Sequence, residues 1–156
     1  MDLDDIDSAI IAQLQLDARQ SNRELARRVG IAASTCLERV RGLHERGVIT
    51  GYHARLDLSK IGRSVQAIVA AQVRPSSRTV INSFHDWAAP RPEVLEVLVV
   101  AGGDDFLIRV AVQDNERLHG FLIDHLAKRK EVVSFRTLVV FQHSATTAIT
   151  PLLTMT

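Results

Sequence analysis

The spacing of apolar residues changes near residue 50 and divides the chain into two parts. Before this point apolar residues recur every three or four positions, which is typical of amphipathic helices. A first helix is predicted over residues 4–17, with acids in its first turn, where the helix dipole favours negative charge. Its buried stripe is predicted to be Ile6, Ile10, Ile11 and Leu14.

Two further short helices are predicted between residues 21 and 46, joined by a tight turn at residues 30–32. The capping box Ser21-x-x-Glu24 begins the first, and Gly30 stands where a helix end needs a left-handed conformation. Gly47 ends the second. The predicted buried stripes are Leu25, Ala26 and Val29 in the first helix and Cys36, Val40 and Leu43 in the second. This is the helix-turn-helix pattern, whose second helix enters the major groove of DNA.

From Ser64 onward the apolar period is mostly two, which indicates strands. The predicted strands are residues 65–73, 93–100, 105–112 and 132–141, and the predicted helices between them centre on residues 80–87 and 118–126. The order βαββαβ is the ferredoxin-like plan. The predicted fold class is therefore α+β, with a three-helix winged helix-turn-helix domain (1–50), a hinge strand or linker (51–62) and a ferredoxin-like domain (63–156).

Both faces of the predicted strands are apolar. The pattern places Val94, Leu98 and Val100 opposite Leu95, Val97 and Val99; Phe106, Ile108 and Val110 opposite Leu107 and Ala111; and Leu138 and Val140 opposite Phe135, Val139 and Phe141. Right-handed crossovers put both helices on one side of the sheet. The other face is therefore expected to pack against a second copy of the chain, and such a dimer also suits a helix-turn-helix.

Charge is concentrated locally, although the whole chain is nearly neutral, with 19 basic and 18 acidic residues. Between residues 19 and 55 eight arginines stand against three glutamates: Arg19, Arg23, Arg27, Arg28, Arg39, Arg41, Arg46 and Arg55 against Glu24, Glu38 and Glu45. Such a segment favours contacts with phosphate groups. A solvated helical face is the alternative interpretation of the same charges.

Several classes of protein are disfavoured. No run of about 18 apolar residues is present for a membrane span, and the acidic start of the chain is unlike a signal peptide. A single cysteine fits a reducing cytoplasm, where we expect the protein, and Cys36 is expected to be a core residue. No hydrolase, Walker or dinucleotide motif is present and the six histidines show no ligand spacing, so neither an enzyme nor a metal or cofactor site is predicted.

The chain resembles the Lrp/AsnC (feast/famine) family of transcription regulators over nearly its whole length. The resemblance rests on LDDIDSAIIAQLQLDAR, SNRELARRVGI, TCLERVRGLHERGVITGY and VVAGGDDFLIRV. It implies a regulator that binds double-stranded DNA, forms dimers that assemble further into tetramers or octamers, and responds to a small effector, usually an amino acid, bound between dimers. An isolated effector-binding or oligomerisation module is the rival interpretation, and the helix-turn-helix argues against it.

The resemblance implies two sets of site residues. The DNA-binding set is Ser21, Asn22, Arg23, Ala33, Ser34, Thr35, Glu38, Arg39 and Arg41, with Arg39 nearer the DNA backbone or supporting the fold. The effector set is Ala101, Gly102, Gly103, Asp104 and Asp105, where glycine amides would approach a ligand carboxylate and an acid would hold its ammonium group. An ordinary hairpin turn is the alternative for this second set.

Four positions depart from the family pattern. Ala32 replaces the Ser usual at the start of the second helix of the pair, so a cap is expected from Ser34, Thr35 or water. Glu38 stands where a basic residue is common; it would repel phosphate but can accept a hydrogen bond from a cytosine amino group. Gln20 replaces an apolar residue, and Gly103 replaces the first acid of the loop motif.

Overall fold

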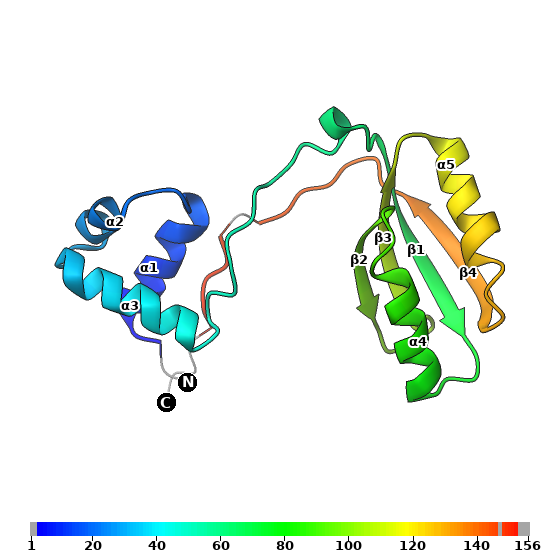
Figure 1. Cartoon of the computed structure of the whole chain (residues 1–156), viewed down its shortest axis with the longest axis horizontal. Coiled ribbons are helices and arrows are strands. Elements are labelled where there is room, and N and C mark those ends of the chain that lie inside the picture. Colours follow the sequence, from blue (N-terminus) through cyan, green and yellow to red (C-terminus); the bar gives the residue numbers. More distant parts are fainter. Residues whose placement is uncertain (1–2, 147, 153–156) are drawn as a thin grey trace. The chain divides into compact units, whose positions relative to one another are not determined.

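Two units, each with its own apolar core, make up the chain (Figure 1). The computed structural model describes residues 3–146 and 148–152. The first unit comprises the described residues among 1–54 and 144–156, and the second unit comprises residues 55–143.

The first unit contains the three predicted helices, α1 (Asp5–Leu16), α2 (Asn22–Val29) and α3 (Ala33–Glu45). Residues of the predicted apolar stripes form the core of this unit. Five of these side chains are at most 3% exposed: Ile10, Leu25, Ala26, Cys36 and Leu43. Cys36 is thus a core residue as expected, and burial raises the pKa of its thiol.

Local hydrogen bonds set the ends of these helices. Ser21 accepts a hydrogen bond from the Glu24 N–H at 3.2 Å and so begins α2, and Gly30 ends it in the left-handed conformation at φ 79°. Gly47 has φ 69°, and the N–H of the residue after it donates to the Leu43 carbonyl at 2.9 Å. This pair of features is a Schellman motif, which confirms that Gly47 ends α3.

A buried carboxylate joins α1 to α3. The Asp7 side chain is 7% exposed and accepts hydrogen bonds from Arg39 at 3.0 Å and from Arg46 at 2.9 Å. Arg39 also bonds Asp4 at 2.5 Å. Asp7 is the only charged residue among those described that is classed as buried, and the two arginines satisfy its charge.

The residues after 143 group with the first unit, whereas the predicted domain boundaries placed them in the second. The Gln15 side chain accounts for the difference. It donates to the Ile149 carbonyl at 2.9 Å and accepts from the Ile149 N–H at 2.7 Å. A side chain that binds backbone far along the chain leaves no periodic signal in the sequence.

The chain between the two cores has little regular structure. Residues 50–57 carry no helix or strand assignment, and a short 3-10 helix, η1 (Ser59–Ile61), follows. No described residue here pairs as a strand, so neither a hydrogen-bonded wing nor the predicted hinge strand is formed within this single chain.

The second unit is a four-stranded antiparallel sheet with two helical segments. Its elements are β1 (Val65–Val73), α4 (Arg78–Ala88), β2 (Val94–Val99), β3 (Phe106–Val112), α5 (Asn115–Gly120) and β4 (Val132–Val139). A π-helical segment, η2 (Phe121–Leu126), continues α5. The strand order β2-β3-β1-β4 is the ferredoxin-like arrangement, which confirms the ferredoxin-like domain of the predicted α+β fold.

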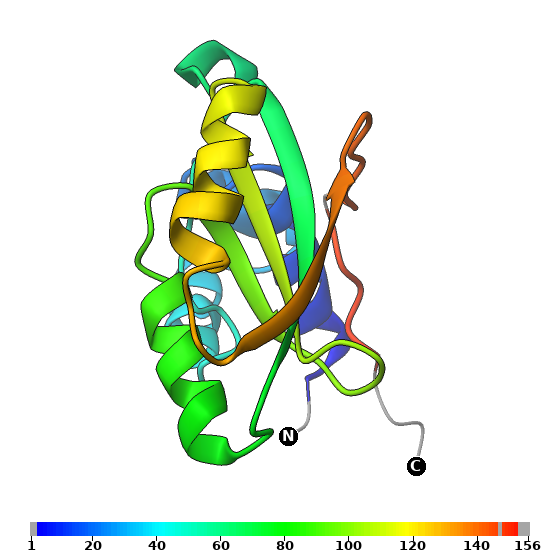
Figure 2. The same cartoon turned by 90° about the vertical axis from the view of Figure 1, so that its right-hand side faces the viewer.

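Both α4 and α5 lie on one face of this sheet (Figure 2). The core between helices and sheet includes Val69, Phe84, Ile108 and Phe121. We call the opposite side the outer face. In register order it carries Glu96 and Leu98 on β2; Leu107, Arg109 and Ala111 on β3; Gln66, Ile68, Ala70 and Gln72 on β1; and Ser134, Arg136 and Leu138 on β4.

The predicted alternation is wrong in two strands. In β2 a bulge between Val94 and Glu96 shifts the register, so Val94 and Val97 both pack on the core instead of lying on opposite faces. The last strand ends at Val139, two residues before Phe141, which is 98% exposed instead of facing the sheet with Phe135. Polar residues also alternate with apolar ones on the outer face, so this face is less apolar than predicted.

We predict that Asp7→Ala lowers the free energy of unfolding of the first unit by about 2 to 3 kcal/mol, because two arginines lose their buried partner. Urea unfolding followed by circular dichroism measures the change. Asp5→Ala is the matched control, since the exposed Asp5 lies in the same helical turn and its loss costs less than about 1 kcal/mol. Equal effects of the two substitutions would contradict this account of Asp7.

Candidate nucleic-acid interface and effector loop

The exposed side of α3 carries most of the predicted DNA-binding residues. Each helical residue turns by about 100°, so Ser34, Glu38 and Arg41 form a stripe opposite the buried Cys36 and Leu43. All three are exposed. Ala33 and Thr35, also exposed, flank the stripe in the first turn.

The start of α2 lies beside the start of α3. The Asn22 side-chain amide donates to the Ala33 carbonyl at 2.7 Å and so joins the two helices across the turn. Ser21, Asn22 and Arg23 are thereby brought next to the first turn of α3. Asn22 thus has a structural role in the single chain, because its side-chain amide stabilises the turn between α2 and α3.

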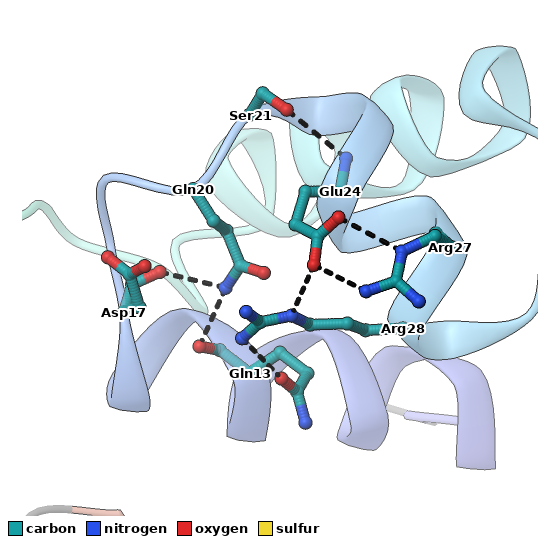
Figure 3. A network of polar contacts seen from close by, with 7 residues as sticks. All are labelled: Gln13, Asp17, Gln20, Ser21, Glu24, Arg27 and Arg28. Carbon is teal, nitrogen blue, oxygen red and sulfur yellow. Dashed lines mark hydrogen bonds and ion pairs between the residues drawn. The ribbon is translucent and has the colours of Figure 1, made fainter.

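Figure 3 shows a network of polar contacts on α1 and α2. The Glu24 carboxylate accepts hydrogen bonds from Arg27 at 2.7 Å and from Arg28 at 2.9 Å. The acid of the predicted capping box is therefore paired with these two arginines. These hydrogen bonds lower the pKa of Glu24 from its ordinary 4.5 to about 2, with Arg27 the larger cause. The Ser21 half of the capping box is formed, as described above.

Gln20, which departs from the family pattern at the position before Ser21, forms hydrogen bonds with the C-terminal end of α1. Its side-chain amide donates to the carbonyl of Gln13 at 2.9 Å and to that of Asp17 at 2.8 Å (Figure 3). The Gln13 carbonyl also accepts the Asp17 N–H at 3.0 Å, so the Gln20 amide adds a side-chain partner to the carbonyls at the C-terminal end of α1. A polar residue is therefore accommodated here.

The basic patch is smaller than the arginine count indicates. Arg27 and Arg28 pair with Glu24, while Arg39 and Arg46 bind acids of α1. The hydrogen bonds that Arg39 donates to Asp4 and Asp7 raise the pKa of Arg39. The hydrogen bonds that Asp4 accepts from the Asp7 N–H and from Arg39 lower the pKa of Asp4. Acids that precede the segment in sequence are thus folded back onto its arginines.

Among the residues that the structure describes, the side chains of Arg23 and Arg41 form no hydrogen bond or ion pair. Both are exposed. These two guanidinium groups therefore remain available to an external anion, in contrast to Arg39, which supports the fold.

The first turn of α3 has no side-chain cap. Ala32 occupies the N-cap position, and neither Ser34 nor Thr35 supplies the cap expected of them. The N–H groups at the start of an α-helix lack helical partners, so this end presents backbone donors to the exterior.

Leu37 belongs to this surface, although the sequence pattern predicts no role for it. It is 53% exposed and lies on α3 between the stripe and the core. It is absent from the residues that pack in or against the core of the first unit. The sequence could have indicated the exposure of Leu37, because this leucine falls outside the predicted buried stripe of Cys36, Val40 and Leu43.

The predicted effector residues form the hairpin loop between β2 and β3. Within it the Asp105 carboxylate accepts hydrogen bonds from the Val73 N–H at 2.8 Å and from Arg74 at 2.9 Å. The Ser76 hydroxyl lies 3.5 Å from its other oxygen. Asp105 therefore fastens the loop to the end of β1 rather than standing free.

The neighbouring Asp104 binds Arg136 of β4 at 2.5 Å. Gln72 of β1 donates to the Gly103 carbonyl and accepts from Ser134 at 3.0 Å. The loop is thus tied to two other strands, and both of its acids already have a cationic partner. Arg136 and Arg74 are themselves 68% and 53% exposed.

Backbone donors of the loop remain open. In the described part of the chain, the N–H groups of Gly102, Gly103 and Asp104 have no hydrogen-bond acceptor. Gly102 has φ 143°, which side-chain-bearing residues rarely adopt. A Cβ added at Gly103 would meet no atom within 4 Å, so the space around this residue is open.

Two other features are absent from residues 3–146 and 148–152. No helix there is both long and apolar enough to cross a membrane. No group of three or more His, Cys, Asp or Glu side chains in the same residues is arranged to hold a metal ion.

Family models match both units. Residues 3–44 match the AsnC-type helix-turn-helix domain, and residues 66–148 match the Lrp/AsnC ligand binding domain. The chain is 42% identical over 142 residues to the HTH-type transcriptional regulator AldR of Mycolicibacterium smegmatis, covering 91% of this chain and 83% of that protein. It is 37% identical over 142 residues to the leucine-responsive regulatory protein of Rhizobium meliloti, covering 91% of each chain.

A solved structure of similar fold is the complex of a Neisseria meningitidis transcriptional regulator with L-methionine. It has a TM-score of 0.89 at 27% identity and covers 95% of this chain and 96% of that one. These relatives are named as regulators, in agreement with the expectation that the chain is not an enzyme.

We predict that NMR titration of the Glu24 carboxyl gives a pKa of about 2. Because the folded-state pKa lies below the unfolded value, the contribution of Glu24 to stability is present above pH 4.5 and is lost as the pH falls towards 2. Arg27→Gln is expected to raise this pKa more than Arg28→Gln, in the order of their effects. A pKa near 4.5 in the unaltered chain would contradict the network.

Proposed function

Because the chain belongs to the Lrp/AsnC family of transcription regulators and is a DNA-binding regulator of that type with a ligand-binding domain, we propose that α3 reads the major groove of double-stranded DNA. We also propose that the outer face of the sheet pairs two chains. We further propose that an amino acid binds at the 101–105 loop between such dimers. The observation that carries the proposal is the exposed face of α3, which the Asp7 and Asn22 contacts hold in place.

The proposed DNA contacts divide into two groups. Ser21, Arg23 and the open N–H groups at the start of α3, in residues 33–35, would bind phosphate. Glu38 and Arg41 would contact base edges, since an arginine reads guanine and a glutamate accepts from a cytosine amino group. Asn22 and Arg39 would act by positioning α3.

Dimerisation is proposed through the outer face. Its apolar residues Ile68, Leu98, Leu107 and Leu138 come from all four strands, and the small residues Ala70 and Ala111 keep its centre flat. Leu98 and Leu138 are 43% and 51% exposed in the single chain. Burial of these side chains against a second sheet favours association. Further assembly into tetramers or octamers stays a prediction.

The effector is proposed to bind through its carboxylate. The N–H groups of Gly102, Gly103 and Asp104 are open donors, and the exposed guanidinium of Arg136 lies beside them on Asp104. Since both acids of the loop already bind arginine, the ammonium group of an amino acid would need acceptors elsewhere, for example from a second dimer. The L-methionine complex of the Neisseria meningitidis regulator supports an amino acid as the class of ligand.

We predict that Arg41→Ala weakens binding to a DNA duplex from upstream of the protein's own gene by about 1 to 3 kcal/mol, because one base or phosphate contact is lost. Gel shifts at several salt concentrations measure it. An unchanged salt slope points to a base contact, and a slope smaller by about 1 points to phosphate.

Arg78→Ala is the control, since this exposed arginine begins α4 in the second unit. It is expected to leave DNA affinity unchanged. Equal losses for Arg41→Ala and Arg78→Ala would contradict the interface, and no binding to any duplex at low salt would contradict DNA binding through α3.

We also predict that at least one of the twenty amino acids shifts the thermal unfolding midpoint or the oligomeric mass of the chain, because a ligand stabilises the state that it binds. Gly103→Ala is expected to preserve the fold, since the added methyl group meets no atom of the chain within 4 Å. It is expected to abolish the shift, because the methyl group would take up space proposed for the ligand. Gly120→Ala, at the end of α5, is the control and should retain the response. A response that survives Gly103→Ala would place the effector elsewhere.

A further inference from the structure

We propose that Leu37 of α3 is a specificity-determining residue that contacts the methyl group of a thymine in the major groove. The inference rests on the proposed function, because it assumes that α3 enters DNA. It adds a partner chemistry, the 5-methyl group of one base, to a residue for which the sequence pattern predicts no role.

Burial is the first argument. Leu37 is 53% exposed, although Cys36, Val40 and Leu43 of the same helix pack in or against the core. In the described first unit, Val40 lies partly buried against the core and Leu43 is fully buried, so α3 does not need Leu37 for folding. Removal of such a side chain from water stabilises whichever complex covers it.

Position is the second argument. Leu37 precedes Arg41 by four residues and follows Ala33 by four, so its side chain lies one turn from each along the helix. It is the fifth residue of α3, and the N-terminal part of a recognition helix is the part that contacts base edges. The surface beside it includes Ser34 and Arg41, which are polar or charged and exposed.

Chemistry selects the partner. The major groove presents hydrogen-bond donors and acceptors on every base pair, but only thymine adds an apolar group, its C5 methyl. An aliphatic side chain without donors or acceptors gains most there by contact with that methyl group. The proposed DNA-binding face of α3 then combines an apolar base contact, from Leu37, with polar base contacts from Glu38 and Arg41.

The experiment begins with in vitro selection of a preferred duplex from a randomised library by the full chain. Each thymine of the selected duplex is then replaced singly by deoxyuridine, which removes only the methyl group. We expect one position per half-site at which this change weakens binding by about fourfold, the value of one buried methyl group. Leu37→Ala is expected to weaken binding to the thymine duplex and to remove the difference between thymine and deoxyuridine there.

Leu16→Ala is the matched control, since Leu16 is a 63% exposed leucine at the end of α1. It should retain the full thymine preference. A selected duplex without a methyl-dependent thymine, or a preference that Leu37→Ala leaves intact, would overturn the proposal while DNA binding itself stands. Failure of the chain to bind any duplex at low salt would instead overturn the proposed function and, with it, this inference.

Discussion

The Asp7 carboxylate holds α1 against α3, and the exposed face of α3 depends on that contact. Two arginines of the helix-turn-helix segment, Arg39 and Arg46, neutralise this buried charge. Because these arginines are paired with Asp7, their charges are already neutralised and contribute less to binding the phosphate groups of DNA. The fold therefore uses part of its own basic charge to fix the orientation of α3. Of the predicted DNA-binding arginines, it leaves Arg23 and Arg41 for an external partner.

The second unit follows a different constraint, since four strands have two faces and two helical segments cover only one of them. The outer face consequently retains exposed leucines on β2 and β4. The same sheet also positions the 101–105 loop, because Gln72, Arg74 and Arg136 tie it to β1 and β4. A ligand at this loop would act directly on the sheet that we propose to pair two chains.

The sequence predicts most of this architecture, because helical and strand periods, caps and glycines act locally. Ser21, Gly30 and Gly47 stand where their chemistry requires. What it misses depends on contacts distant in sequence or on small changes of register. The bulge after Val94 and the attachment of Ile149 to Gln15 leave no periodic trace. The count of arginines likewise overstated the patch, since pairing of Arg39 with Asp7 appears only when α1 and α3 meet.

Hydroxyl-radical footprinting of the full chain on DNA from upstream of its own gene tests the central claim most directly, that two α3 helices of a sheet-paired dimer read the major groove. The account predicts two protected regions on one side of the duplex, with centres about 34 Å apart or a multiple of this distance. A single unpaired protected region, or protection without a helical repeat, would contradict it.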